Sequence, residues 1–146
     1  MRQGIIAWAC PVFALVLGGM LNCSPVQPAE VVGTWVLTDA SRNRLSADIQ
    51  RARAQLVLRQ DGSFVATDLP GLFASGDRDA AKLESGSGVW RFESTGGERQ
   101  LLLEFRTRSD TTRSRPIGTD LHVSRGSLFY FIGDPDNGVK MSLEKQ

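Results

Sequence analysis

Residues 88–106 read GVWRFESTGGERQLLLEFR, and the pattern of this stretch decides the fold class. Every second side chain on either side of the pair Gly96-Gly97 is apolar, and these side chains are Trp90, Phe92, Leu101, Leu103 and Phe105. A period of two is typical of a strand with one buried face. Adjacent glycines supply the positive φ angles of a tight turn. The stretch therefore predicts an antiparallel β-hairpin.

Similar short runs separated by turn residues continue outward from this hairpin in both directions. Gln60-Asp61-Gly62-Ser63 is typical of a two-residue hairpin turn, and 134–138 combines a proline with Asn-Gly. We expect strands at 31–37, 55–59, 63–67, 88–93, 100–106, 119–124, 127–132 and 140–144. Neighbouring hairpins in chain order predict an all-β domain, an antiparallel up-and-down barrel of about eight strands.

One stretch, 41–53, has helical spacing instead. Leu45, Ile49 and Ala52 fall on one side of a helix of about three turns, with no Gly or Pro inside it. The arginines of the opposite, solvated side are Arg42, Arg44, Arg51 and Arg53. The expected strand at 127–132 is apolar on both faces, so this helix is a candidate to cover its outer side.

The N-terminal segment predicts export. Residues 1–22 hold Arg2 and then an apolar run from Ile5 to Leu21, the pattern of a secretory signal peptide. An uncleaved membrane anchor is an alternative, since about 17 apolar residues lie at the lower limit for a span. Residues 23–30 contain two prolines and form a short tether, and 31–146 form the folded domain.

Met20-Leu21-Asn22-Cys23-Ser24 resembles the lipobox of bacterial lipoproteins. The resemblance implies a lipid on Cys23, anchorage to a membrane of the bacterial cell envelope and, in a cell with two membranes, sorting to the outer one. Acylation also removes a thiol that would be reactive in an oxidising compartment. An ordinary signal peptide with an incidental cysteine is the alternative.

Charge and composition exclude several classes of function. The chain of 146 residues has 17 basic and 16 acidic side chains, and Arg2 is the only charged residue before Cys23. The remainder is neutral, so binding to nucleic acid is not expected. The chain has one histidine and two cysteines, and both cysteines lie in the first 23 residues, so we expect no metal and no cofactor.

Val32-Gly33-Thr34-Trp35, followed by a β-meander, resembles the opening strand of lipocalin-like proteins and of fatty-acid-binding proteins. The resemblance implies that Trp35 closes the barrel floor and that a helix lies over the barrel mouth. The tail 133–140, GDPDNGVK, together with Gly88-Val89-Trp90 also resembles uncharacterised secreted bacterial lipoproteins built as small lipocalin-like, calycin-type domains. The Arg-x-Tyr pair that grips a carboxylate in fatty-acid-binding proteins has no counterpart in 139–144, so that function does not transfer.

Catalysis is not expected. His122 shares its run with Asp120 and Ser124, but these three alternate along one strand without a nucleophile elbow. Residues 134, 136 and 137 are Asp, Asp and Asn, whose spacing is not that of a calcium loop and whose role in a turn is sufficient.

Two binding functions from different classes remain. In the first, the barrel binds a small apolar or amphipathic ligand between interior side chains, which are Trp35, Phe64, Trp90, Phe92, Phe105 and Phe129. In the second, the barrel is packed and the long loops 69–87 and 107–118 contact or inhibit an envelope protein. The second predicts an exposed apolar patch around Leu69, Leu72 and Phe73. A loop that binds an anion or a partner has as candidates Arg106, Arg108, Arg113 and Arg115.

Overall fold

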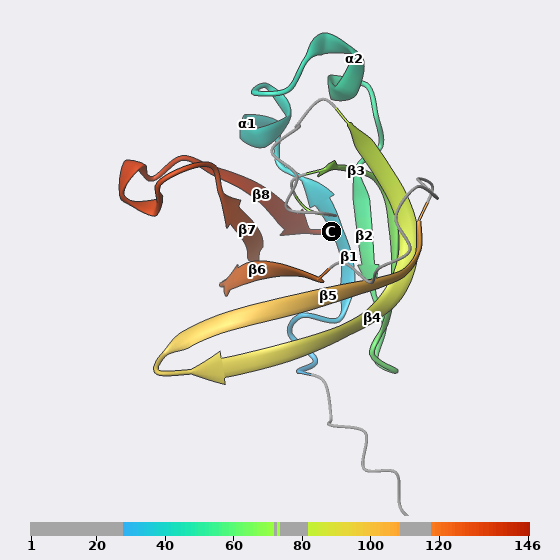
Figure 1. The fold of residues 1–146 in the computed structure, drawn as a ribbon, viewed down its shortest axis with the longest axis vertical. Coiled ribbons are helices and arrows are strands. Elements are labelled where there is room, and N and C mark those ends of the chain that lie inside the picture. The colour runs from blue at the N-terminus through green and yellow to red at the C-terminus, as the bar shows by residue number, and fades with distance from the viewer. Residues whose placement is uncertain (1–27, 72, 74–81, 109–117) are drawn as a thin grey trace, which may run out of the picture.

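The computed structural model describes residues 28–71, 73, 82–108 and 118–146. Its strands are β1 (Gly33–Leu37), β2 (Gln55–Leu58), β3 (Ser63–Pro70), β4 (Leu83–Thr95), β5 (Glu98–Arg108), β6 (Gly118–Ser124), β7 (Ser127–Phe131) and β8 (Lys140–Lys145). Each strand pairs antiparallel with the next, and β8 returns to pair with β1 (Figure 1). The predicted eight-stranded antiparallel up-and-down barrel is confirmed.

Alternation along the strands sends one set of side chains into the barrel. Trp35 and Leu37 of β1 are buried, as are Leu56 and Leu58 of β2. The register keeps these rows level, because Trp35 lies opposite Leu56 and Gly33 opposite Leu58. A one-residue slip would turn each row outward, so burial of these side chains fixes the register.

The two hairpin turns singled out in the sequence differ in length. Thr95 lies opposite Glu98, so only Gly96 and Gly97, both with positive φ, connect β4 to β5. In the β2–β3 turn the Arg59 N–H donates to the Ser63 carbonyl at 2.9 Å, which leaves three residues between them. The expectation of a two-residue turn there is wrong, because the Asp61 carboxylate accepts from the Ser63 N–H at 2.8 Å and so stabilises the longer turn.

Strand β3 runs past its predicted end through a bulge. Asp68 has φ 48°, and its N–H donates to Ser85 Oγ at 2.9 Å while that hydroxyl donates to the Asp68 carboxylate at 3.3 Å. After this irregularity Leu69 and Pro70 rejoin the ladder opposite β4. Both ends of the predicted loop 69–87 therefore belong to strands, and β4 begins already at Leu83.

The predicted three-turn helix over 41–53 is wrong. The connection holds two helices of four residues each, α1 (Asp39–Arg42) and α2 (Ala47–Gln50). A straight helix of 13 residues would carry the chain about 20 Å away, yet Gln55 must return to lie opposite Val36. Arg42 Nη1 holds the bend by donating to the Gln50 carbonyl at 3.1 Å and to the Ala52 carbonyl at 2.8 Å.

The outer side of β7 is covered by side chains from neighbouring strands rather than by the helical connection. Phe129 stacks on His122 of β6, with ring centroids 5.2 Å apart, and meets Phe131 edge to face at 5.4 Å. Helix α1 lies instead against β8, where Ser41 Oγ accepts from the Ser142 N–H at 2.8 Å. The prediction that the helix covers 127–132 is therefore wrong.

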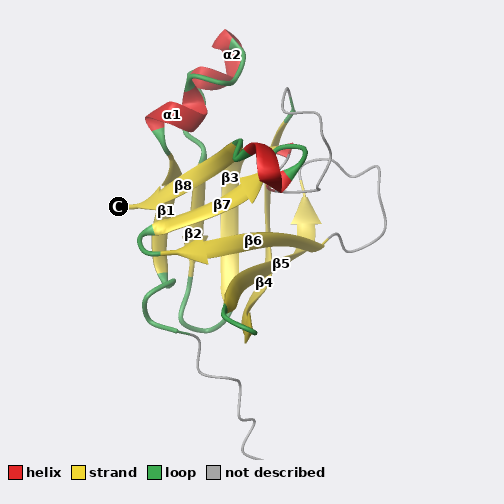
Figure 2. Ribbon diagram, turned by 90° about the vertical axis from the view of Figure 1, so that its left-hand side faces the viewer, coloured by secondary structure: helices red, strands yellow, loops and turns green. Residues whose placement is uncertain are grey.

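The two ends of the barrel differ because up-and-down connections alternate between them. The N-terminal segment from Pro28 and the turns β2–β3, β4–β5 and β6–β7 share one end, as the pairing of Gly33 with Leu58 requires. The helical connection and η1 (Pro135–Asn137) lie at the other (Figure 2). We call these the terminal end and the helical end.

Candidate functional site

The barrel interior holds four of the six predicted ligand-lining residues as packed core. Trp35, Phe64, Trp90 and Phe105 are at most 3% exposed. The Trp35 indole N–H donates to the Val31 carbonyl at 2.8 Å and the Trp90 indole N–H to the Arg59 carbonyl at 3.0 Å. Phe64 and Phe105 meet edge to face at 4.8 Å. Each large ring is thus held by a backbone or ring partner.

Most of the remaining inward side chains are large as well. The largest of those under 2% exposed, besides Trp35, Trp90 and Phe64, are Phe73, Leu56, Leu58, Leu69, Leu101, Leu103, Leu121, Leu128 and Met141. An eight-stranded barrel is just wide enough for such side chains to fill it. Leu69 and Phe73 are themselves fully buried, so the predicted exposed patch around them is wrong. Leu72, the third member, lies outside the described residues.

The other two predicted lining residues lie in different places. Phe92 packs against the core opposite the fully buried Leu101, but it is only partly buried, with the Arg99 guanidinium 5.4 Å from its ring centroid. Phe129 is wrong as an interior residue. Its neighbour Leu128 points inward, and Phe129 lies on the outer face, where Lys140 Nζ approaches its ring to 4.7 Å.

The structure describes only part of the predicted arginine loop. Arg106 is exposed on β5, and Arg108 ends that strand. Arg113 and Arg115 lie outside the described residues, and so do Cys23 and the whole predicted signal peptide.

His122 contacts aromatic rings rather than a nucleophile. It stacks on Phe129 and meets Phe131 edge to face at 5.2 Å. Asp134 accepts from the Asp136 N–H at 3.0 Å and so caps η1, which is the turn role expected of it. Within the described ranges no group of three or more His, Cys, Asp or Glu side chains is placed to hold a metal ion. No helix among the same residues is long and apolar enough to cross a membrane.

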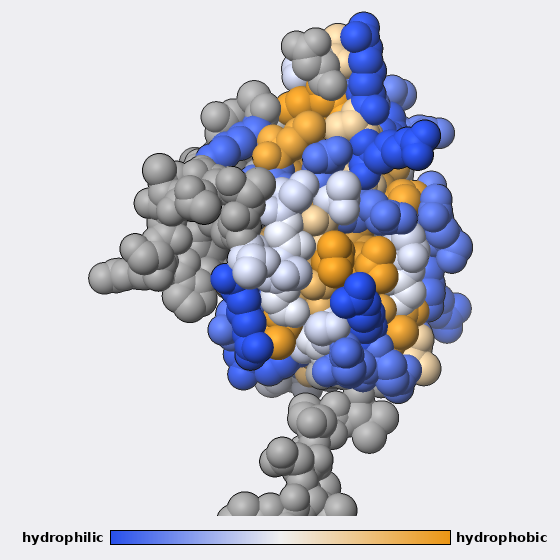
Figure 3. All heavy atoms as spheres, turned by 90° about the vertical axis from the view of Figure 1, so that its right-hand side faces the viewer, coloured by the Kyte–Doolittle hydropathy of each residue, from blue (hydrophilic) through white to orange (hydrophobic). Residues whose placement is uncertain are grey.

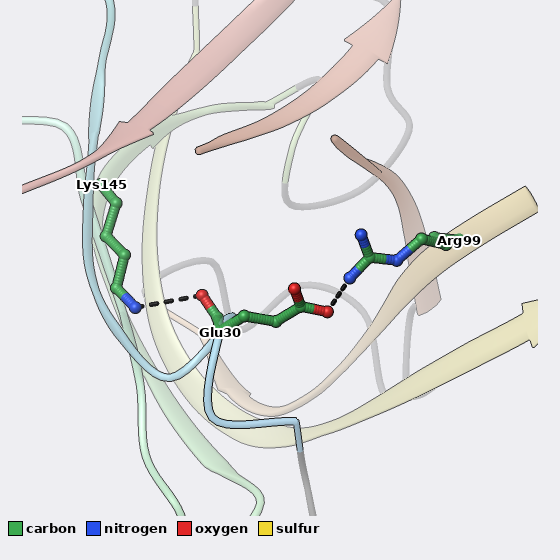
Figure 4. A network of polar contacts seen from close by, with 3 residues as sticks. All are labelled: Glu30, Arg99 and Lys145. Atoms are coloured by element: carbon green, nitrogen blue, oxygen red, sulfur yellow. Dashed lines mark hydrogen bonds and ion pairs between the residues drawn. The ribbon is translucent and has the colours of Figure 1, made fainter. Parts of the chain in front are cut away.

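A polar network fastens the N-terminal segment to the terminal end (Figure 4). The Glu30 carboxylate pairs with Arg99 at the start of β5, and Lys145 Nζ donates to the Glu30 carbonyl at 3.0 Å. The Lys145 stem passes over Gly33, where a β-carbon would lie 2.7 Å from Lys145 Cε. Gly33 also has φ 141°, a backbone conformation that L side chains rarely adopt, so the Gly33 of the Gly-x-Trp motif has a conformational role.

An open hollow of about 450 Å³ lies outside the barrel, between the helical connection and the outer side of β1. Its lining residues are Val36, Arg42, Arg53, Ala54, Gln55 and Gln146. Sequence reasoning missed this site, because it placed both arginines on a solvated helix face. Arg42 is half-buried and bonded to two carbonyls of the connection. The lining residues come from segments far apart in the sequence, so no pattern within one stretch of sequence predicts the hollow.

On the outer face of β2, β3 and β4, apolar side chains are scattered among polar ones. Val57 and Val65 lie opposite each other there and are half-buried. Figure 3 shows the apolar side chains of this face interspersed with polar and charged ones. Such scattered side chains are normal on a soluble surface.

Comparison of the chain with protein-family models, curated proteins and solved structures finds no match. The resemblance to bacterial lipoproteins and to lipocalin-like proteins stays a prediction from the sequence.

Proposed function

We propose that this chain is a non-catalytic lipoprotein of the bacterial cell envelope, anchored through Cys23, whose packed barrel is a scaffold for contact with an envelope protein. Of the two functions indicated by the sequence, this one uses the surface of the barrel and not its interior. The observation that carries it is the set of large, fully buried side chains inside the barrel, Trp35 and Trp90 among them. Rings held by backbone hydrogen bonds leave little room for a guest.

The anchor supports the helical end as the contact surface. Pro28 is the fifth residue after Cys23, a reach of at most about 18 Å along the chain. Pro28 belongs to the terminal end, where Glu30 is tied to Arg99 and Lys145. A lipid on Cys23 therefore holds the terminal end toward the membrane and turns the helical end away from it.

The test compares two exposed arginines at opposite ends. Arg44 lies between α1 and α2, and Arg125 lies in the β6–β7 turn; both are exposed. In each of two variants of the full chain, a photo-crosslinking amino acid replaces one of these residues. Both variants are expressed in the organism that the protein comes from. We expect an adduct of one discrete mass from position 44 and none of that mass from position 125, because only the helical end faces the partner.

The same adduct from both positions, or no adduct from position 44, would contradict the proposal. Folding of both variants is checked by their thermal midpoints, which are expected to match the wild type because exposed surface substitutions change stability little.

A further inference from the structure

We infer that the hollow beside α1 binds a small organic oxyanion, a phosphate or carboxylate group carried on a short apolar chain. The inference goes beyond the proposed protein contact and does not depend on it. It rests on the two arginines and the two apolar residues that line the hollow.

Arg42 is a preorganised cation. Its Nη1 atom donates to the carbonyls of Gln50 and Ala52, at 3.1 Å and 2.8 Å. These bonds hold the planar guanidinium in one orientation, so an anion that reaches its remaining donors immobilises little more of the side chain. Arginine suits this role because its forked donors match the oxygens of carboxylate and phosphate.

Arg53 supplies the second charge. It is exposed, lies two residues before the start of β2, and lines the same hollow. Among the described residues it has no ion pair, and the side chains that line the hollow include no carboxylate. Glu144, which is exposed, is the cross-strand partner of Val36 and flanks the site. Two arginines that line one hollow favour binding of an anion there.

The rest of the lining defines what the anion carries. Val36 and Ala54 provide apolar surface, and the amides of Gln55 and Gln146 add neutral donors and acceptors. A volume of about 450 Å³ lies in the range of ordinary small-molecule sites. The combination fits a ligand with one charged head and a short apolar tail.

The test is a phosphorus NMR titration of the full chain in a maltoside detergent, with inorganic phosphate and butyl phosphate as probes. Wild type is expected to bind both, and butyl phosphate more tightly. Arg53→Gln is expected to weaken butyl phosphate binding about tenfold, the loss of one charge-assisted contact. Its thermal midpoint is expected to stay unchanged, because the Arg53 side chain has no partner among the described residues to lose.

Arg125→Gln is the matched control, since it removes an exposed arginine from the other end of the barrel. Its affinity is expected to equal that of the wild type. Equal affinity of Arg53→Gln and wild type for butyl phosphate would overturn the inference. So would a failure of wild type to bind either probe at about 10 mM, the weakest affinity expected of a small ligand.

Two further experiments test the apolar part of the ligand and the source of the ligand. Val36→Thr keeps the shape but adds a hydroxyl, so it is expected to reduce the preference for butyl phosphate over inorganic phosphate several-fold. An unchanged preference would overturn the assignment of the apolar part. Competition by a short-chain phosphatidic acid would support a lipid headgroup as the source, and binding of butyl phosphate without that competition would support a free metabolite.

Discussion

Thr119 is a buried polar residue whose hydroxyl has no hydrogen-bond partner in the described part of the chain. It points inward from β6 and is 4% exposed. Burial of a hydroxyl without a partner is unfavourable by about 1–3 kcal/mol. We expect Thr119→Val, which keeps the shape, to raise the free energy of unfolding by about 1 kcal/mol, measured by urea denaturation.

The matched control for this substitution is Thr67→Val, at an exposed position of β3. We expect it to change the free energy of unfolding by less than about 0.5 kcal/mol. A loss of stability in Thr119→Val beyond that range would mean that the hydroxyl bonds to a group outside the described residues.

The contrast between Trp90 and Phe129 shows how far single residues are predictable from the sequence. Trp90 belongs to a strand with one apolar face, so alternation alone places it inside, and it is buried. Phe129 belongs to a strand that is apolar on both faces, so the pattern of apolar and polar residues does not show which face is buried. The inward side of β7 is fixed by pairing of Leu128 with Leu143 across the ladder, and this register is not visible in one strand.

Close packing requires glycine at position 88, and the neighbouring sequence does not predict this requirement. A β-carbon there would overlap the Glu104 carbonyl and lie 2.9 Å from the Phe64 ring. The position lies at the register shift between β4 and β5, where the two backbones approach closely. The sequence supplies only a glycine at the start of a strand, whereas the close approach comes from pairing with β5.

At the scale of elements, the β2–β3 turn is expected to depend on pH. Hydrogen bonds from Ser63, first from its hydroxyl and then from its N–H, hold the pKa of Asp61 below its ordinary value. A carboxylate with a lowered folded-state pKa stabilises the fold above the unfolded pKa of 3.8 and loses that contribution as the pH falls through the folded value. We therefore expect the turn to loosen in acid.

NMR hydrogen exchange at the Ser63 amide, followed from neutral to acidic pH, measures this loosening. Asp61→Asn keeps an acceptor but cannot titrate, so its exchange is expected to show no acid-dependent step at this turn. An identical step in both proteins would assign the effect to another group.

The sequence predicts which residues of the helical connection are buried, but it does not predict the shape of the connection. Leu45 and Ile49 are buried, as helical spacing predicts. The same spacing says nothing about where the chain must arrive, and pairing of Gln55 with Val36 forces a bend. Arg42 stabilises that bend from within the connection, so the residue predicted to be solvated became part of the candidate site.

At the scale of the whole molecule, the proposed anchor has a direct test. The chain has two cysteines, Cys10 and Cys23, and attachment of a lipid as a thioether requires the thiol. In cells fed a radiolabelled fatty acid, we expect label in wild type and in Cys10→Ala, and none in Cys23→Ala. Equal labelling of the two variants would contradict lipidation at Cys23.

Closure of the barrel by its first and last strands has a consequence for how the chain matures. Val36 lies opposite Glu144, and the Gln146 N–H donates to the Thr34 carbonyl at 2.9 Å. Until β8 has been synthesised, β1 and β7 are free sheet edges open to pairing with other chains. Completion of the fold therefore waits for the last strand, so the unfinished sheet stays exposed to such pairing for most of the time that synthesis takes.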